Sequence, residues 1–346
     1  MAPCMSCSGF KLHPLKSFIK QLNKHYYNNM KRSIFTLSVL LSSINLFAQS
    51  PVKYDTVSVG QIKQVVSYTG TENSPIILFL HGGPGSSRMK QADLFSNTLR
   101  THFMVVQWDQ RDAGRTLALN KSNVPINVKL MVDDTYELSR LLLRKFNQKK
   151  LYLVGESFGT VVGFKIAEQH PELLNAYIAF SPVVNQSQSE QILLEKLKVD
   201  AKQKANLSAQ KELSTVQIPY GNYEQLGYAK KWLLISYGQS LTDDNVVAFN
   251  EYIKGWSATW LPTWNEAIGL NLFKELPKIN CPVYFFLGKT DLQTNFGIAK
   301  AYFEFLKAPK KELFVFDNAG HSVLTEEAEQ VQKLIISNVL NNGKNN

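Results

Sequence analysis

The chain has 346 residues, of which 44% are hydrophobic and 11% aromatic, enough for one large domain or a domain with an insertion. A chain of this composition is not expected to be disordered. The formal net charge is +10, but residues 1–48 contribute six of these charges and contain no Asp or Glu, which leaves +4 for the remaining chain. That remainder is an ordinary charge for solubility, so nucleic acid is not expected as a partner.

The segment from residue 30 to residue 48 has the pattern of a secretory signal peptide. Lys31 and Arg32 come first, a short apolar run follows, and Ala48 is the small residue after which cleavage is expected. The run is shorter than the about 20 apolar residues of a membrane-spanning helix. The sequence therefore predicts a secreted or periplasmic protein with no membrane anchor after cleavage, and an uncleaved, anchored form is the alternative.

Residues 1–29 precede this leader and have no place in a signal peptide, which begins at its basic cluster. Our hypothesis is that Met30 is the true start and that residues 1–29 are a mis-called extension. Cys4 and Cys7 form a C-x-x-C motif there, but one such pair alone is weak evidence for a metal or redox site. Only Cys281 follows the leader, so the mature chain is predicted to have no internal disulfide. No metal or other cofactor is predicted.

The mature chain begins with the pattern of two strands at the edge of a sheet. Residues 52–59 and 61–68 alternate around Gly60, which predicts an antiparallel hairpin. Residues 75–80 are continuously apolar, as expected for a strand buried on both faces of a largely parallel sheet. This strand leads into the glycine-rich segment 81–87, which lacks both the spacing and the lysine of a phosphate-binding loop.

A second buried strand is predicted at residues 103–108, and the segment after it is unusually charged. Four charged side chains occur within eight residues. One interpretation is a solvated loop held by an Asp109–Arg111 or an Asp112–Arg115 ion pair. The other interpretation is a functional loop.

The next segments predict a helix, a strand and a sharp turn. Residues 128–146 have apolar side chains three and four apart behind Asn127, which predicts an amphipathic helix with an N-terminal cap. Residues 151–154 are rich in strand formers and run directly into the motif Gly-Glu-Ser-Phe-Gly around Ser157, after which helical spacing resumes. Such a turn holds the serine in a strained conformation with its hydroxyl above the carboxyl edge of the sheet.

The alternation of strands and helices stops after a strand predicted at residues 176–180. The helical patterns that follow lie at residues 190–213, 224–237, 243–256 and 265–275. The whole stretch 183–278 contains four of the five tryptophans, Trp232, Trp256, Trp260 and Trp264. We interpret residues 183–278 as a helical lid inserted between two parts of the core, residues 51–182 and 279–342. Most of its aromatic side chains are expected to form the lid core, and one or two to line a substrate pocket.

The sheet resumes near the end of the chain. Strands are predicted at residues 282–288 and 312–316, with a helix at residues 295–306 between them and a closing helix after them. Asp291 follows the first of these strands and His321 follows the second. The predicted fold class is therefore α/β, with a mostly parallel sheet flanked by helices and an inserted helical lid.

These loops predict a catalytic triad. Of the six histidines, only His321 lies after both the serine motif and a carboxylate at a strand end. His321 would accept the proton of Ser157, and Asp291 would orient His321 and stabilise its protonated form. Asp317 is the rival acid, but it is only four residues from His321 and could simply cap its loop.

An oxyanion hole is predicted beside Ser157. The backbone N–H groups of Phe158 and Gly83 are expected to hold the negative oxygen, with Gly82 as the second choice to Gly83. Glycine suits this place because no Cβ obstructs the approach of the substrate oxygen to the backbone.

Four motifs together resemble the proline iminopeptidase family of serine aminopeptidases, which are α/β-hydrolases. They are His-Gly-Gly-Pro-Gly at residues 81–85, Asp-Gln-Arg at 109–111, Gly-Glu-Ser-Phe-Gly at 155–159 and Gly-His-Ser at 320–322. The resemblance covers the predicted core and implies that the protein releases N-terminal residues, often proline, from peptides through Ser157, Asp291 and His321.

The resemblance also implies that carboxylates of the lid hold the free α-amino group of the substrate, since a buried ammonium needs a charged partner. Two departures are seen: Asp112 stands where the family usually has glycine, and the lid motif W-x-x-W-E is reduced to Trp256 and Trp260 without the glutamate. The candidate substrate-binding residues are Glu195, Glu224, Glu251, Glu266, Trp256 and Trp260.

Two other functions stay open. The first is a carboxylesterase or thioesterase on the same scaffold, in which the aromatic lid admits an apolar acyl chain and no carboxylate binds an amine. The second is a binding protein of this fold without catalysis, which the strained serine turn argues against, because binding alone does not need it. Whether the protein is an aminopeptidase or an esterase, its expected partner is a small peptide or ester substrate.

Overall fold

The computed structural model describes residues 51–241 and 243–340 of the chain. The predicted extension at residues 1–29 and the predicted signal peptide at residues 30–48 lie outside the described residues. No helix within the described ranges is long and apolar enough to cross a membrane.

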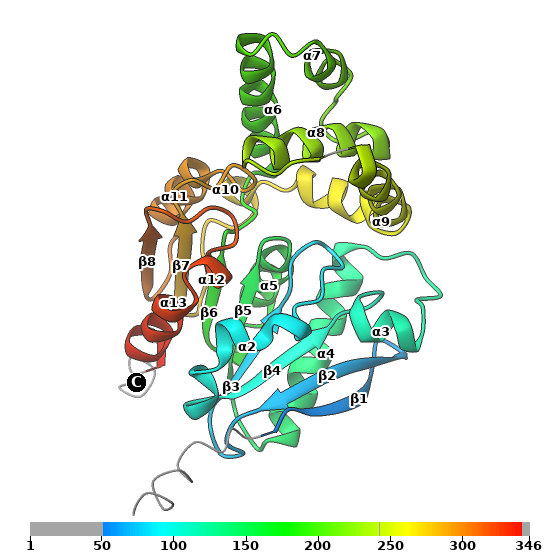
Figure 1. Ribbon diagram of the computed structural model, residues 1–346. Coiled ribbons are helices and arrows are strands. Elements are labelled where there is room, and N and C mark those ends of the chain that lie inside the picture. Colours follow the sequence, from blue (N-terminus) through cyan, green and yellow to red (C-terminus); the bar gives the residue numbers. More distant parts are fainter. Residues whose placement is uncertain (1–50, 242, 341–346) are drawn as a thin grey trace, which may run out of the picture. The chain divides into compact units, whose positions relative to one another are not determined.

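An eight-stranded sheet forms the centre of the described chain, in the order β1-β2-β4-β3-β5-β6-β7-β8 (Figure 1). The strands are β1 (Lys53–Val59), β2 (Ile62–Thr69), β3 (Ile76–Leu80), β4 (Met104–Asp109), β5 (Leu151–Glu156), β6 (Leu174–Phe180), β7 (Val283–Gly288) and β8 (Lys311–Phe316). β2 pairs antiparallel with β1 and β4, and all other pairs are parallel. The predicted edge hairpin and the predicted fold class are confirmed.

Helices cover both faces of this sheet. They are α2 (Ala92–Ser96), α3 (Gly114–Leu119), α4 (Val128–Lys145), α5 (Gly159–Gln169), α11 (Phe296–Phe305), α12 (Val323–Glu326) and α13 (Ala328–Leu334), with short 3₁₀ turns at Met89–Gln91, Leu99–Thr101 and Pro171–Leu173 and a π-helical turn at Ile335–Leu340. In β3, Leu78 packs in the core cluster that includes α4, α5 and α11, whereas Ile77 and Phe79 pack in the cluster that includes α2 and α13. Burial on both faces explains the continuous apolar run of this strand.

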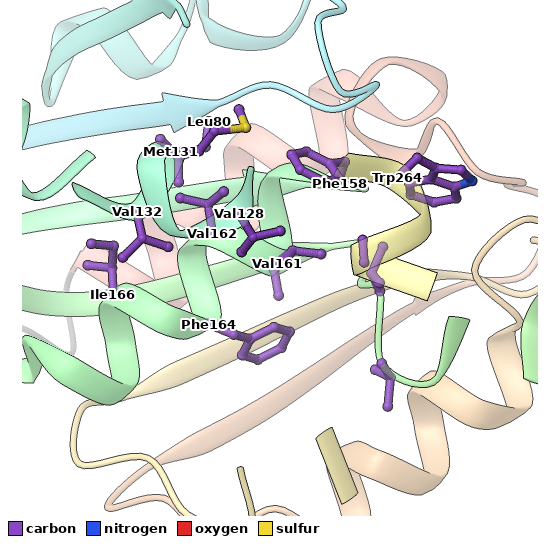
Figure 2. Close-up of a cluster of buried hydrophobic side chains, with 14 of the residues drawn as sticks. Leu80, Val128, Met131, Val132, Phe158, Val161, Val162, Phe164, Ile166 and Trp264 are labelled. Carbon is purple, nitrogen blue, oxygen red and sulfur yellow. The ribbon is translucent and has the colours of Figure 1, made fainter. Parts of the chain in front are cut away.

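The core under the serine turn is built by α5. Figure 2 shows Val161, Val162 and Ile166 of this helix among side chains of α4, with Phe158 at the start of the helix close to Trp264. The rings of Phe158 and Trp264 are 6.4 Å apart between centroids. This packing fixes the helix that follows Ser157 and connects it to the lid.

The chain between β6 and β7 is helical, as the sequence patterns predict. The helix predicted at residues 224–237 is confirmed within one residue at each end, whereas the other helices differ from the expected ones. They are α6 (Gln186–Gln203), α7 (Leu207–Ser214), α8 (Tyr223–Ser236), α9 (Asp243–Gly269) and α10 (Leu272–Glu275). The single helix predicted at residues 190–213 is wrong, because α6 ends at Gln203. Asn206 then caps α7 by accepting a hydrogen bond from Ala209 N–H (3.0 Å). Likewise, α9 continues through Pro262, where a break was predicted.

Three of the four charged side chains at the end of β4 and just after it, Asp109, Arg111 and Asp112, are buried, so this segment is not the solvated loop of the first interpretation. Arg111 is 1% exposed and binds both carboxylate oxygens of Asp134 in α4, each at 2.9 Å, so the predicted pair with Asp109 is wrong. Asp109 instead accepts a hydrogen bond from the backbone N–H of Arg115 (2.7 Å). Asp112 accepts one from the backbone N–H of Ser122 (2.6 Å). This segment therefore fixes the strand end next to the glycine-rich loop.

Candidate active site

Ser157 lies at a sharp turn between β5 and α5. Its φ is +51°, in the left-handed region that residues other than glycine rarely adopt. A Cβ at Gly155 would lie 2.8 Å from the carbonyl oxygen of Gly159, and a Cβ at Gly159 would clash with the carbonyl oxygen of Leu80. The strand and the helix therefore cross closely on either side of the turn, which explains why both neighbours of this turn are glycines.

Three side chains from three loops meet at the carboxyl edge of the sheet. His321 follows β8 and Asp291 follows β7. The distance from His321 Nε2 to Ser157 Oγ is 2.9 Å, and the distance from His321 Nδ1 to Asp291 Oδ2 is also 2.9 Å. Asp317 is mostly exposed and forms an ion pair with Lys289 (2.8 Å). The acid that contacts His321 is thus Asp291.

Asp291 is held by the loop in which it lies. Its Oδ1 accepts hydrogen bonds from the backbone N–H groups of Gln293 (2.8 Å) and Thr294 (3.1 Å), and its Oδ2 accepts one from the Thr294 hydroxyl (2.7 Å). Thr294 was not among the predicted site residues, although aspartate side chains in turns commonly bind backbone N–H groups a few residues further on. With these bonds the carboxylate is fixed in the position that orients His321.

The ionisation of this pair follows from burial and mutual attraction. Burial alone would lower the pKa of His321, but the charge of Asp291 and the hydrogen bond to it outweigh burial and bring the pKa above the usual 6.5. Burial alone would raise the pKa of Asp291, yet the charge of His321 and the hydrogen bonds bring it below the usual 3.8. Asp291 is therefore a carboxylate at neutral pH, and its charge favours the protonated form of His321.

The glycine-rich loop lies against Ser157. A Cβ at Gly82 would lie 3.0 Å from the Cβ of Ser157, and Gly83 lines the cavity above the serine with a φ of +114°. The buried side chain of His81 supports this loop. Its Nδ1 lies 3.0 Å from the carbonyl oxygen of Gly82, and its Nε2 accepts a hydrogen bond from the backbone N–H of Gln110 (3.3 Å). The predicted oxyanion donors at Phe158 and Gly83 thus lie on the two segments that flank the serine.

An ion pair missed in the sequence ties the same loop to the end of β5. Arg88 donates two hydrogen bonds to the carboxylate of Glu156, at 2.8 and 2.6 Å, and Glu156 directly precedes Ser157. The Glu156 side chain is 4% exposed. Because both oxygens are bound by one guanidinium, this pair fixes the spacing between the glycine-rich loop and the serine turn.

A cavity of about 710 Å³ opens above Ser157 and His321. Its lining from the lid is mostly apolar and aromatic, with Leu226, Leu233, Leu234, Phe249, Ile253, Trp256 and Trp264, and also contains Lys230. Trp256 donates a hydrogen bond from Nε1 to Pro84 O (2.9 Å), which joins the lid to the glycine-rich loop. Trp260 is buried against Gly85, so it supports this loop and does not line the cavity.

None of the four glutamates predicted from the sequence lines this cavity. Glu195 pairs with Lys198 at the surface (3.0 Å). Glu224 and Glu251 border a separate hollow of about 180 Å³. Glu266 accepts the backbone N–H of Val128 (2.9 Å). Spacing along a helix did not reveal which of these side chains face the serine.

A different carboxylate, Glu190 of α6, lies beside the cavity lining. Its side chain is 1% exposed and accepts hydrogen bonds from Tyr220 OH (2.7 Å) and Gln186 Nε2 (3.2 Å). Lys230 lies 3.7 Å away. Among residues 51–241 and 243–340, no group of three or more His, Cys, Asp or Glu side chains is arranged to hold a metal ion.

Comparison with known proteins identifies the family. Residues 75–328 match the family model described as alpha/beta hydrolase fold. A probable aminopeptidase YbaC of Bacillus subtilis (strain 168) is 27% identical over 292 residues, which cover 78% of this chain and 91% of that protein. A proline iminopeptidase of Lactobacillus delbrueckii subsp. bulgaricus is 24% identical, covering 77% of this chain and 89% of that protein. These relatives confirm the resemblance that the motifs indicate.

A solved structure of a membrane phospholipase A, described as a bacterial virulence factor, superposes with a TM-score of 0.61 at 19% identity, covering 96% of this chain and 100% of that one. At this identity the likeness concerns the fold alone. The sheet order, the serine turn and the family match agree, and the chain belongs to the α/β-hydrolase fold family.

Proposed function

We propose that this protein is a serine hydrolase in which Ser157 is the nucleophile, His321 the general base and Asp291 the residue that orients His321. The observation that carries this proposal is the continuous hydrogen-bonded chain from Asp291 through His321 to Ser157 Oγ, with both links at 2.9 Å. The strained φ of Ser157 supports it, because strain of this kind is found mostly at functional sites.

The reaction then follows from the geometry. His321 Nε2 takes the proton of Ser157 as Oγ attacks the acyl carbon, and the negative oxygen that forms is bound by the N–H groups of Phe158 and Gly83. His321 gives the proton to the leaving group, which departs and leaves an acyl-enzyme on Ser157. Water, activated by the same His321, releases the acyl group and restores the serine.

The first candidate substrate class is peptides with a free N-terminal residue. It is supported by the motifs around Gly83, Ser157 and His321 and by two relatives, one named a probable aminopeptidase and one named a proline iminopeptidase. The leader predicted at residues 30–48 would place this activity outside the cell or in the periplasm.

The second candidate is the hydrolysis of esters, and the lining of the cavity favours it. The lid side chains that line the cavity are mostly apolar, and the charged one among them is the cation of Lys230. None of the four predicted glutamates lines it, so none is placed to bind a substrate ammonium from the lid side.

A paired assay on the purified protein separates the two candidates. Alanyl and prolyl arylamides are compared with their N-acylated forms and with short acyl esters, with Ser157→Ala as the blank. An aminopeptidase is expected to cleave the free-amine arylamides and to spare the N-acylated ones. Turnover of esters alone would assign the protein to the esterases, and no serine-dependent turnover of any of these substrates would contradict the proposal.

A further inference from the structure

Lys230 has an unusual position for a lysine. It lies on α8 and lines the cavity above Ser157, and its side chain is 22% exposed. The described residue that pairs with it is Glu190, but the distance from Nζ to Oε1 is 3.7 Å, longer than a hydrogen bond. Its charge also acts on His321, where it opposes the rise of the pKa that Asp291 causes. The ammonium is therefore close to the reacting groups and has N–H donors to spare.

Another hydrogen-bond donor, the indole N–H of Trp264, lies near Lys230 and has no acceptor among the described residues. Trp264 lines the same cavity, its side chain is buried, and its Nε1–H has no partner among the residues that the structure describes. Figure 2 shows its indole nitrogen on the side turned away from Phe158 and the apolar cluster. Lys230 Nζ is 5.9 Å from the Trp264 ring centroid. A buried indole N–H without an acceptor is costly unless another group supplies one.

The need to neutralise the charge of Glu190 does not by itself explain why Lys230 lies at the cavity. Glu190 already accepts two shorter hydrogen bonds, from Tyr220 OH (2.7 Å) and Gln186 Nε2 (3.2 Å). Gln186 is oriented by a further bond from Nε2 to Gln293 O (2.8 Å), which leaves its Oε1 without a partner in the described chain. Glu190 thus anchors the lysine from one side, while the lysine keeps its donors for the cavity.

We infer that Lys230, together with Trp264, binds a carboxylate of the substrate whose acyl bond Ser157 attacks. The substrates are then esters or amides that carry a carboxylate besides the bond that is cleaved. The inference rests on the proposed function and extends it to a substrate class. An ammonium and an indole N–H both donate to carboxylate oxygens, and the apolar side chains around them strengthen the attraction by excluding water.

Two pairs of probes test this inference, because the carboxylate can belong to the acyl part or to the leaving group. Mono(4-nitrophenyl) glutarate is compared with 4-nitrophenyl pentanoate, and alanyl-alanine with alanyl-alaninamide. For each pair the ratio of kcat/KM for the anionic to the neutral probe is measured. Lys230→Met keeps the aliphatic stem and removes the charge, and it should lower the ratio of at least one pair about 10- to 100-fold.

Matched variants exclude a general effect of charge or folding. Lys254→Met makes the same change in net charge on α9 at a lysine that does not line this cavity, and it should leave both ratios unchanged. Lys230→Arg keeps the charge and should keep most of the ratio. Trp264→Phe keeps a ring and removes the N–H, so it should lower the ratio by a smaller factor than Lys230→Met.

Glu190→Gln separates this inference from recognition of an amine. Without the Glu190 charge, Lys230 is less compensated, so the preference for the anionic probe should rise. If Glu190 bound the substrate ammonium instead, the variant would lose alanyl arylamide cleavage and would leave the ratios unchanged. If, for both probe pairs, the ratio of kcat/KM is the same in the wild type and in Lys230→Met, the inference is overturned. Serine-dependent turnover of the neutral probes would in that case still uphold the proposed function. No serine-dependent turnover of any probe would overturn both.

Discussion

Replacing Ser157 by alanine is expected to lower kcat/KM about 10⁴- to 10⁶-fold on every substrate that the protein hydrolyses. The substitution removes only Oγ, the atom 2.9 Å from His321 Nε2, and with it the covalent step. Hydrolysis without an acyl-enzyme would have to proceed by direct attack of water, helped only by binding and by the oxyanion donors.

The Ser157→Ala loss is measured by ester and arylamide hydrolysis under saturating and limiting substrate. Thermal unfolding serves as the control, because alanine keeps a Cβ at the same positive φ and should leave the melting temperature close to that of the wild type. Turnover within about tenfold of the wild type in a folded variant would show that another group is the nucleophile.

Replacing Asp291 by asparagine is expected to lower kcat/KM about 10³- to 10⁴-fold. The amide has nearly the same shape, but it no longer stabilises the protonated His321 and can turn its NH₂ group toward Nδ1, which selects the wrong tautomer. The substitution removes the contact between Asp291 Oδ2 and His321 Nδ1 at 2.9 Å. It also removes the negative charge that raises the pKa of His321.

The pH profile gives the Asp291→Asn prediction a second readout. His321 must be neutral to act as a base, so kcat/KM of the wild type should fall as the pH drops through a His321 pKa above 6.5. In Asp291→Asn this pKa is lower, and the acid limb of the residual activity should move to lower pH. Asp317→Asn is the matched control, since Asp317 is mostly exposed and pairs with Lys289. A large loss in Asp317→Asn with an unchanged Asp291→Asn would reverse the assignment of the acid.

The sheet and the serine turn could be predicted because their causes are local. The run at residues 76–80 is apolar since both faces of β3 are covered, and the glycines around Ser157 are needed where strand and helix cross. The order of strand ends along the chain was enough to bring Asp291 and His321 to the same edge as Ser157, because the carboxyl ends of parallel strands meet there.

The ends of several lid helices, the lid side chains that face the cavity and the partners of buried charges could not be predicted, because they depend on contacts between segments far apart in the sequence. Arg111 pairs with Asp134 in α4, and a sequence pattern gives no reason to prefer it over Asp109 next to Arg111. Pro262 lies inside α9, where tertiary packing of Trp260 and Trp264 keeps the helix continuous. Which lid side chains reach the cavity depends on how these helices pack, so Lys230 was missed.

The central claim is that Ser157 is the nucleophile, and the most direct test is to find where an alkyl fluorophosphonate reacts. Mass spectrometry of the digested protein should locate a single phosphonyl adduct on the peptide that contains Ser157. The adduct should form far more slowly in His321→Ala, because the hydroxyl then has no base at 2.9 Å. An adduct on another residue, or full substrate turnover in protein that carries the Ser157 adduct, would contradict the claim.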